Sequence, residues 1–312
     1  MMMGRDSRPP HPPRAELQAG LAGLPFDLEA GSVAYYEDPT YYDAEFDPRR
    51  ADVRFYQAQY LDTEGPVLEL GIGSGRIAIP AVRAGAEVYG LDTAPKMLAR
   101  AEEKRRALPS AAQERLTLTL GDMRTFTLER RFELISCPFN ALQHLYRGEE
   151  VSACFERVLT HLAPGGLFIF DVLFPDLEYL LRSPLTRHPG VNFHHSTYDA
   201  VYNYSEQSAY DPIKQINQMW LHYERVDPPL TRAEAEAVLY ASEEGAFVQL
   251  EEGAPARFTL QLTHRCFFPQ ELTSLLRCAG LEVLQILGDF EGGALTVDSE
   301  SMIFLCRRAG GG

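Results

Sequence analysis

A glycine-rich turn follows a short run of branched apolar residues in VLELGIGSGRIAIP, the stretch from Val67 to Pro80. Three glycines stand at alternate positions, Gly71, Gly73 and Gly75. Glycine suits a backbone that turns tightly and approaches a ligand closely, because it has no Cβ to obstruct either. The stretch therefore predicts a strand, a turn and a helix that together bind a nucleotide-like ligand.

Apolar runs alternate with helix-like segments from Gly65 onward. The expected strands are residues 67–70, 87–91, 115–120, 132–137 and 167–172. The expected helices between them are residues 75–84, 95–107 and 149–162. One more helix should begin at Pro48, capped by Asp47, and end near Leu61. Such alternation predicts an α/β fold with a doubly wound, mostly parallel, Rossmann-like sheet and right-handed crossovers.

Composition excludes several classes of partner. A chain of 312 residues with 45% hydrophobic content can bury a sizeable core. The sequence contains neither a membrane-length apolar run nor the apolar region of a secretory signal. A net charge of -15 disfavours contact with a nucleic-acid backbone. The five cysteines include no C-x-x-C pair, which suggests reduced thiols. We therefore expect a cytoplasmic protein without nucleic-acid or membrane partners.

Charge at the glycine turn distinguishes two ligands. Asp92 closes the second strand, where an acid can hydrogen-bond a ribose diol. A dinucleotide site needs G-x-G-x-x-G, but here the third glycine comes one position early and Arg76 stands in its place. Glu69, at the mouth of the first strand, is also badly placed for a pyrophosphate. S-adenosylmethionine (SAM) carries a sulfonium and an ammonium and no phosphate, so it fits better.

The sequence resembles the class I SAM-dependent methyltransferases over roughly residues 31–175 and 264–308. VLELGIGSG is similar to their first motif, GLDTAPKML to the second, GDMRTF to the third and FELISCPFNALQHL to the fourth. HLAPGGLFIFDV resembles their strand-five signature, and the segment from FFPQELTSLLRC onward resembles their last helix and β-hairpin. These motifs are specific for SAM binding and leave the methyl acceptor open.

The resemblance implies roles for individual residues at the cofactor. Asp92 is expected on the ribose hydroxyls, Met97 against the adenine, and Asp122 and Met123 at the adenine amino group and ring. The other expected cofactor-binding residues are Tyr42, Glu69, Gly71, Gly73, Gly75, Thr93 and Pro138. No metal is expected, because the adjacent His194 and His195 have no further ligand at a suitable spacing.

The segment 176–263 exceeds what the minimal family fold needs. STYDAVYNYSEQ, QINQMWLHYERV and ARFTLQLTHRCF are β-like, and AYDP is typical of a turn between the first two. We expect an antiparallel sheet that forms a lid, loosely similar to that of bacterial amino-sugar and natural-product N-methyltransferases. The alternative is an insert that serves only dimerisation, so a homodimer through it is a further expectation. Residues 1–30 are expected to be a disordered tail.

His144 is the candidate catalytic residue, because the fourth motif brings it near the reacting centre. An imidazole there titrates near neutrality and can accept a proton from, or orient, a small-molecule amine or hydroxyl. The alternative is a structural or cofactor-side histidine. Tyr41, Asn140 and Trp220 are expected at the acceptor, although Tyr41 can equally pack its segment onto the sheet. Trp220 and Tyr223 lie on opposite faces of one strand, so one of them should line the pocket.

The expected function is methyl transfer from SAM to a nitrogen or oxygen of a small molecule. Nitrogen is slightly favoured, since an amine only needs to arrive deprotonated whereas a hydroxyl more often needs a base. Two alternatives remain at this point. The chain could be a non-catalytic SAM-fold binding or partner protein, or, against the charge pattern at the turn, a nicotinamide-dependent oxidoreductase.

Overall fold

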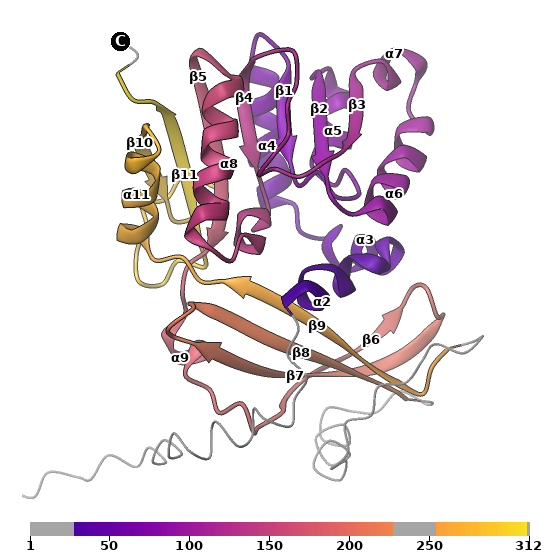
Figure 1. The fold of residues 1–312 in the computed structure, drawn as a ribbon. Coiled ribbons are helices and arrows are strands. Elements are labelled where there is room, and N and C mark those ends of the chain that lie inside the picture. The colour runs from indigo at the N-terminus through magenta and orange to yellow at the C-terminus, as the bar shows by residue number, and fades with distance from the viewer. Residues whose placement is uncertain (1–27, 227–253, 311–312) are drawn as a thin grey trace, which may run out of the picture.

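The computed structural model describes residues 28–226 and 254–310 (Figure 1). The predicted tail, residues 1–30, lies outside this part except for its last three residues, which begin helix α2 (Leu28–Val33). Part of the predicted insert, residues 227–253, also lies outside it.

A seven-stranded sheet forms the centre of the larger domain, and it confirms the predicted α/β fold. Its strands are β1 (Val67–Leu70), β2 (Val88–Asp92), β3 (Leu116–Leu120), β4 (Phe132–Cys137), β5 (Leu162–Leu173), β10 (Leu281–Leu287) and β11 (Ser301–Arg308). Their order is β10-β11-β5-β4-β1-β2-β3. The strands β1 to β5 pair in parallel, and β11 runs antiparallel to both of its neighbours. The ligand-binding edge of such a sheet is the one at the carboxyl ends of the parallel strands.

Helices cover both faces of this sheet. They are α4 (Ala51–Asp62), α5 (Ala78–Ala84), α6 (Pro95–Arg106), α7 (Ser110–Gln113), α8 (Gly148–His161) and α11 (Pro269–Cys278). One core packs α8 and α11 against the sheet, and the other packs α4 and α5 against the opposite face. In α8 the buried positions Val151, Cys154, Phe155 and Val158 have the spacing of a single helical face.

The predicted start of α4 at Pro48 is wrong by three residues. The preceding helix, α3 (Pro39–Phe46), takes Asp47 as its C-cap, and the Asp47 N–H donates to the Asp43 carbonyl. Because Asp47 ends one helix, it cannot cap the next, and α4 begins after Arg50.

A second sheet, antiparallel and four-stranded, lies below the carboxyl ends of the first in Figure 1. It contains β6 (His188–His195), β7 (Ala200–Asp211), β8 (Ile216–Arg225) and β9 (Arg257–Arg265), in that order, and α9 (Leu177–Leu180) precedes it. The turn between β7 and β8 begins at Pro212, the last residue of the predicted AYDP turn. Strand β6 was not expected, since HPGVNFHH contains proline and glycine, which β-strands disfavour.

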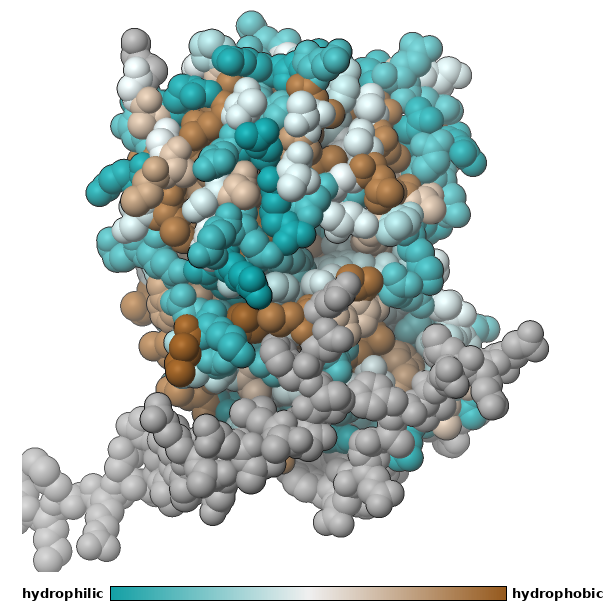
Figure 2. Space-filling view, in the orientation of Figure 1, coloured by the Kyte–Doolittle hydropathy of each residue, from teal (hydrophilic) through white to brown (hydrophobic). Residues whose placement is uncertain are grey.

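Aromatic side chains join the two sheets through α2, η1 (Ala34–Glu37) and α3. Tyr35 and Tyr41 from this segment share a buried cluster with Tyr202, Tyr223 and Phe258 of the second sheet. Tyr223 stacks on Phe258 with ring centroids 4.5 Å apart. In Figure 2 hydrophobic residues gather near this junction and beside α9. The cluster therefore fixes the second sheet over the ligand-binding edge of the first.

Candidate active site

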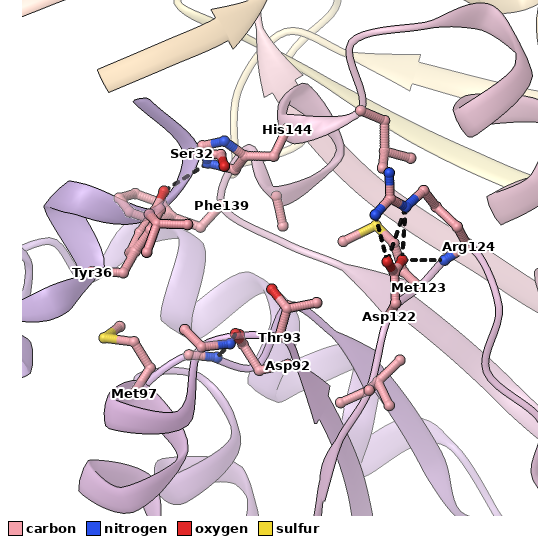
Figure 3. Close-up of a pocket in the computed structure, with 18 of the residues that line it drawn as sticks. Ser32, Tyr36, Asp92, Thr93, Met97, Asp122, Met123, Arg124, Phe139 and His144 are labelled. Carbon is pink, nitrogen blue, oxygen red and sulfur yellow. Dashed lines mark hydrogen bonds and ion pairs between the residues drawn. The ribbon is translucent and has the colours of Figure 1, made fainter. Parts of the chain in front are cut away.

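A cavity of about 690 Å³ opens at the carboxyl ends of the parallel strands (Figure 3). Gly71, Asp92, Gly121 and Pro138 follow or end strands β1 to β4, and all four line it. The segment from α2 to α3 closes the other side. The strand-end geometry thus brings together the motifs that the sequence analysis selected.

The glycine turn has the conformation that its sequence requires. Gly71, Gly73 and Gly75 have φ values of 71°, 56° and 77°. A Cβ on Gly71 would lie 2.6 Å from the Ala141 Cβ, so the space beside the turn also excludes a side chain. Gly75 does not line the cavity; a Cβ there would lie 2.9 Å from Cγ1 of Ile79, in the first turn of α5.

Asp92 is held at the end of β2 by the backbone. Its Oδ2 accepts from the Gly73 N–H at 2.7 Å, and its Oδ1 accepts from the Ala94 N–H at 2.8 Å. Burial raises the pKa of this carboxyl group, and the backbone hydrogen bonds oppose that rise. The two bonds fix the carboxylate at the cavity wall, beside Thr93 and Met97 (Figure 3).

Asp122 lies at the cavity wall in an ion pair. Its Oδ2 is 2.6 Å from an Arg124 guanidinium nitrogen, and Arg124 also pairs with Glu150 at 2.6 Å. Burial alone would raise the pKa of Asp122, but the hydrogen bonds from Arg124 lower it below its ordinary value. Asp122 is therefore ionised and oriented, with Met123 beside it in the lining.

His144 ends the short 3-10 helix η2 (Ala141–His144) and lines the cavity across from Asp92 (Figure 3). Its Nε2 lies 2.7 Å from the Tyr36 hydroxyl, and the two rings meet edge to face. Burial lowers the pKa of His144 to about 4. The expectation of titration near neutrality is therefore wrong, because desolvation disfavours the imidazolium. The ring is neutral at physiological pH.

Ten of the fifteen predicted site residues line this cavity. They are His144, Tyr42, Gly71, Gly73, Asp92, Thr93, Met97, Asp122, Met123 and Pro138. The other five, Glu69, Gly75, Tyr41, Asn140 and Trp220, are outside the lining.

Tyr41 and Trp220 lie away from the cavity for different reasons. Tyr41 packs in the junction, with its ring stacked on His195 and its hydroxyl 3.4 Å from that of Tyr223. Trp220 is buried on the face of β8 opposite to Met219 and Leu221, and Leu221 belongs to the junction cluster. Neither of the two predicted alternatives on this strand lines the cavity, and Tyr223 packs in the junction cluster instead.

Glu69 lies behind the glycine turn, which corrects the expectation of an anion at the strand mouth. It is buried, and its Oε2 accepts from the Tyr60 hydroxyl at 2.9 Å. Burial raises its pKa to about 8. Arg76 also points away from the ligand, since it pairs with Asp52 and lies over the Phe139 ring at 4.3 Å. Both residues stabilise the turn from behind.

Asp171 of β5 is a site-forming residue that the sequence analysis missed. Its Oδ1 accepts from the Tyr56 hydroxyl at 2.6 Å and from the Phe139 N–H at 2.8 Å, and its Oδ2 accepts from the Asn140 N–H at 3.3 Å. Phe139 and Asn140 have φ values of 54° and 63°, unusual for residues with a Cβ. Asp171 holds this strained turn after β4. The available signal was a lone acid inside the apolar run LFIFDV.

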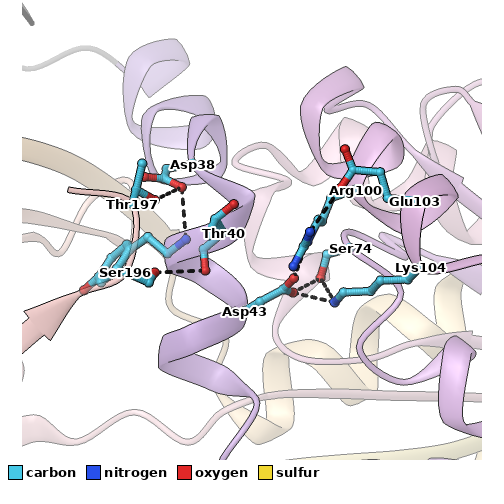
Figure 4. A network of polar contacts seen from close by, with 10 residues as sticks. Asp38, Thr40, Asp43, Ser74, Arg100, Glu103, Lys104, Ser196 and Thr197 are labelled. Carbon is cyan, nitrogen blue, oxygen red and sulfur yellow. Dashed lines mark hydrogen bonds and ion pairs between the residues drawn. The ribbon is translucent and has the colours of Figure 1, made fainter. Parts of the chain in front are cut away.

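Helix α3 is bonded to both domains (Figure 4). Asp43 accepts from Ser74 of the glycine turn at 2.6 Å, and from Arg100 and Lys104 of α6 at 2.8 and 2.6 Å. On the other side, Asp38 accepts from the Thr197 hydroxyl of the β6–β7 turn at 2.8 Å. The helix that carries Tyr42 to the cavity is thus fixed to the core and to the second sheet.

Neither a metal-binding cluster nor a membrane-spanning helix is found in the described residues, 28–226 and 254–310. Within these ranges, no group of three or more His, Cys, Asp or Glu side chains could hold a metal ion. The same ranges include no helix that is both long and apolar enough to span a bilayer.

Comparison with known proteins identifies a methyltransferase domain within the chain. Residues 67–166 match the family described as a methyltransferase domain. A protein of Geobacillus sp. (strain WCH70) with a provisional methyltransferase name is 24% identical over 89% of this chain and 98% of its own length. A dTDP-3-amino-3,6-dideoxy-alpha-D-glucopyranose N,N-dimethyltransferase of Streptomyces fradiae is 31% identical, over 39% of this chain and 44% of its own length.

The solved structure of the CcbJ methyltransferase from Streptomyces caelestis has the same fold, with a TM-score of 0.64 and 24% identity. The match covers 84% of this chain and 96% of that one. Residues 67–166 therefore form a methyltransferase domain, within a fold that this solved methyltransferase shares. SAM is the cofactor. The cavity at the glycine turn, called the first cavity below, fits this cofactor. Its wall carries ionised or backbone-bound carboxylates and a glycine turn, which suit a cationic nucleoside without phosphate.

Proposed function

We propose that this methyltransferase binds SAM in the cavity at the glycine turn and methylates a nitrogen or oxygen of a small molecule. The observation that carries the proposal is the placement of Asp92 and His144 on opposite sides of one cavity (Figure 3). We expect the carboxylate to hydrogen-bond the ribose diol and the imidazole to face the approaching acceptor. A nicotinamide reaction is disfavoured, because Arg76 is turned away to Asp52 and offers nothing to a pyrophosphate.

Different residues of the first cavity are proposed to contact different parts of SAM. Asp92 would hold the ribose, Met97 and Met123 would flank the adenine, and Asp122 would face the adenine amino group. Bound SAM supplies a methyl group on a sulfonium, which is already a good leaving group. The chain must therefore exclude water and align the acceptor rather than activate the donor.

His144 is proposed to contact the acceptor as a neutral ring. With Nε2 beside the Tyr36 hydroxyl, the imidazole is fixed in orientation. With Nε2–H donating to the Tyr36 hydroxyl, Nδ1 of the neutral ring can accept a hydrogen bond from an amine or hydroxyl and orient its lone pair, which a protonated ring cannot do. This role requires little basicity and favours an amine that arrives deprotonated, so nitrogen remains the favoured acceptor atom.

The second sheet is proposed as the lid of the active site, with residues 31–175 and 264–308 as the SAM-binding core. The bonds of α3 to both domains support this division. A homodimer through the second sheet remains a prediction. Exposed Leu177, Leu181 and Leu185 beside the sheet give it an apolar surface for such a contact. A cytoplasmic location is likewise proposed from composition alone.

Replacing Asp92 with alanine should weaken SAM binding by about 10- to 150-fold. The ribose would lose a charge-assisted hydrogen bond worth roughly 1.5–3 kcal/mol. Isothermal titration calorimetry with SAM, and with NAD as the competing ligand, measures this. Asp62→Ala, at the exposed end of α4, is the matched control and should bind SAM as the wild type does. Wild-type protein that bound NAD and not SAM would refute the proposed function.

A further inference from the structure

A second cavity, of about 960 Å³, lies between the two domains. The end of β5 and the loop before β11 form its core side, where Leu173 and Glu300 line it. Helix α9 and one face of the second sheet form the other side, with Met219 and His264 in the lining. It is large enough for a small-molecule ligand.

The two cavities meet at one short segment of chain. Gln143 lines the second cavity, and its neighbour His144 lines the first. Gln143 is fixed, since its Nε2 donates to the Arg265 carbonyl at 2.8 Å and its Oε1 accepts from the Leu173 N–H at 3.2 Å. The rings of His144 and His264 are 5.1 Å apart. A ligand in the second cavity therefore lies one side chain away from the cofactor site.

The inner wall of the second cavity has one buried polar atom without a partner among the described residues. Asn217 lines it, is 5% exposed, and has an Oδ1 that accepts no hydrogen bond from the described residues. Asn217 and His264 are directly opposite each other on β8 and β9, so their side chains share a face. A buried acceptor without a donor is costly, which indicates that a ligand supplies one.

The outer wall is acidic. Asp176, Glu178, Asp298 and Glu300 line it, and all four are exposed. Among the described residues that line this cavity there is no lysine or arginine. Carboxylates of one sign at a cleft mouth attract cations and repel anions before contact.

We propose that the second cavity binds the part of the methyl acceptor remote from its reacting nitrogen, which lies at His144 in the first cavity, and selects an uncharged or cationic amine over a phosphate-bearing one. The inference rests on the proposed function and adds the charge class of the substrate. Asn217 Oδ1 accepts a hydrogen bond from the acceptor, and the four carboxylates exclude phosphate. This distinguishes the chain from its Streptomyces fradiae relative, whose name gives a dTDP-linked sugar as its substrate.

The proposal is tested with pairs of amines that differ only in a phosphate or nucleoside diphosphate group. A panel of amino sugars and amino alcohols, each free and in its phosphate-linked form, is offered with labelled SAM. We expect the free amines to be methylated. The kcat/KM of each phosphate-linked form should be at least about tenfold lower than the kcat/KM of its free amine. Methylation confined to the linked forms, or of no amine by protein that binds SAM normally, would overturn the proposal. Failure to bind SAM would instead refute the proposed function.

Two variants connect the selectivity to this cavity. Asp298→Lys with Glu300→Lys should raise the relative kcat/KM of the linked partner at least about tenfold. Asp62→Lys with Glu64→Lys, the same charge change at exposed positions on the far side of the core, should leave the ratio unchanged. Asn217→Leu should raise the KM of the free amine about tenfold, with kcat and SAM affinity nearly constant. Equal effects of the two double variants would show that the selectivity comes from net charge alone.

Discussion

Replacing His144 with glutamine is expected to lower turnover on the order of 10²-fold, the cost of a misaligned acceptor, with SAM affinity nearly unchanged. The ring lines the first cavity across from Asp92, with its Nε2 beside the Tyr36 hydroxyl. Glutamine keeps a polar group of similar length but not the geometry of the imidazole. Single-turnover rates with labelled SAM, together with calorimetric SAM affinity, measure the effect.

The pH profile separates this role from a structural one. Because burial lowers the pKa of His144 to about 4, the neutral ring is present at all higher pH values. Turnover that needs the neutral ring, corrected for the falling fraction of deprotonated amine, should therefore stay level as the pH falls toward 5 and decline as it passes through about 4. Tyr36→Phe, which removes only the hydroxyl on Nε2, should cost about tenfold, the worth of one hydrogen bond. A wild-type acidic limb near pH 6.5 that vanishes in His144→Gln would contradict the buried, neutral ring. Lost SAM affinity or thermal stability in His144→Gln would indicate a structural role.

Replacing Asp52 with alanine is expected to lower the free energy of unfolding by about 3–5 kcal/mol. Asp52 and Arg76 form an ion pair whose side chains are 3% and 4% exposed. Removing the carboxylate leaves the guanidinium buried without its counter-charge, under the glycine turn. For a chain of this size the midpoint of thermal unfolding should fall on the order of 10 °C, measured by calorimetry without cofactor.

The double variant Asp52→Leu with Arg76→Met isolates the cause. With neither charge left in the interior, most of the lost stability should return, because an apolar pair of similar volume is often as stable as a buried ion pair. Asp62→Ala on the same helix should change the unfolding free energy by less than about 0.5 kcal/mol. A double variant as unstable as Asp52→Ala would show that packing, and not the unpaired charge, sets the loss.

The fold class could be predicted from the sequence, and so could the exact first and last residues of strands β1 and β4. Each of these strands is a short apolar run bounded by turn signals, so its information is local. Errors arose where two signals compete, as at Asp47, which could cap a helix on either side. Strand β6 was missed because pairing with β7, and not its own composition, makes it a strand.

The candidate site divides in the same way. The glycine turn, Asp92, Asp122 and His144 stand beside strand ends, and parallel strands bring their ends to one edge, so sequence order predicted their meeting. The sequence could assign Trp220 and Tyr223 to opposite faces of one strand, but it could not tell which face packs against the rest of the protein. That choice depends on the partner surface, which only the junction cluster supplies.

The sequence by itself therefore determined the architecture of the cofactor domain and the residues along its ligand-binding edge. The tertiary structure alone decided the chemical state of those residues and the second cavity. Burial gives His144 a neutral ring and Glu69 a raised pKa, and desolvation depends on what the rest of the chain places around a group. Asp171 holds the turn after β4, and Asn217 and His264 line the second cavity, because packing brought β5 and the second sheet together, a contact between distant segments that no local pattern encodes.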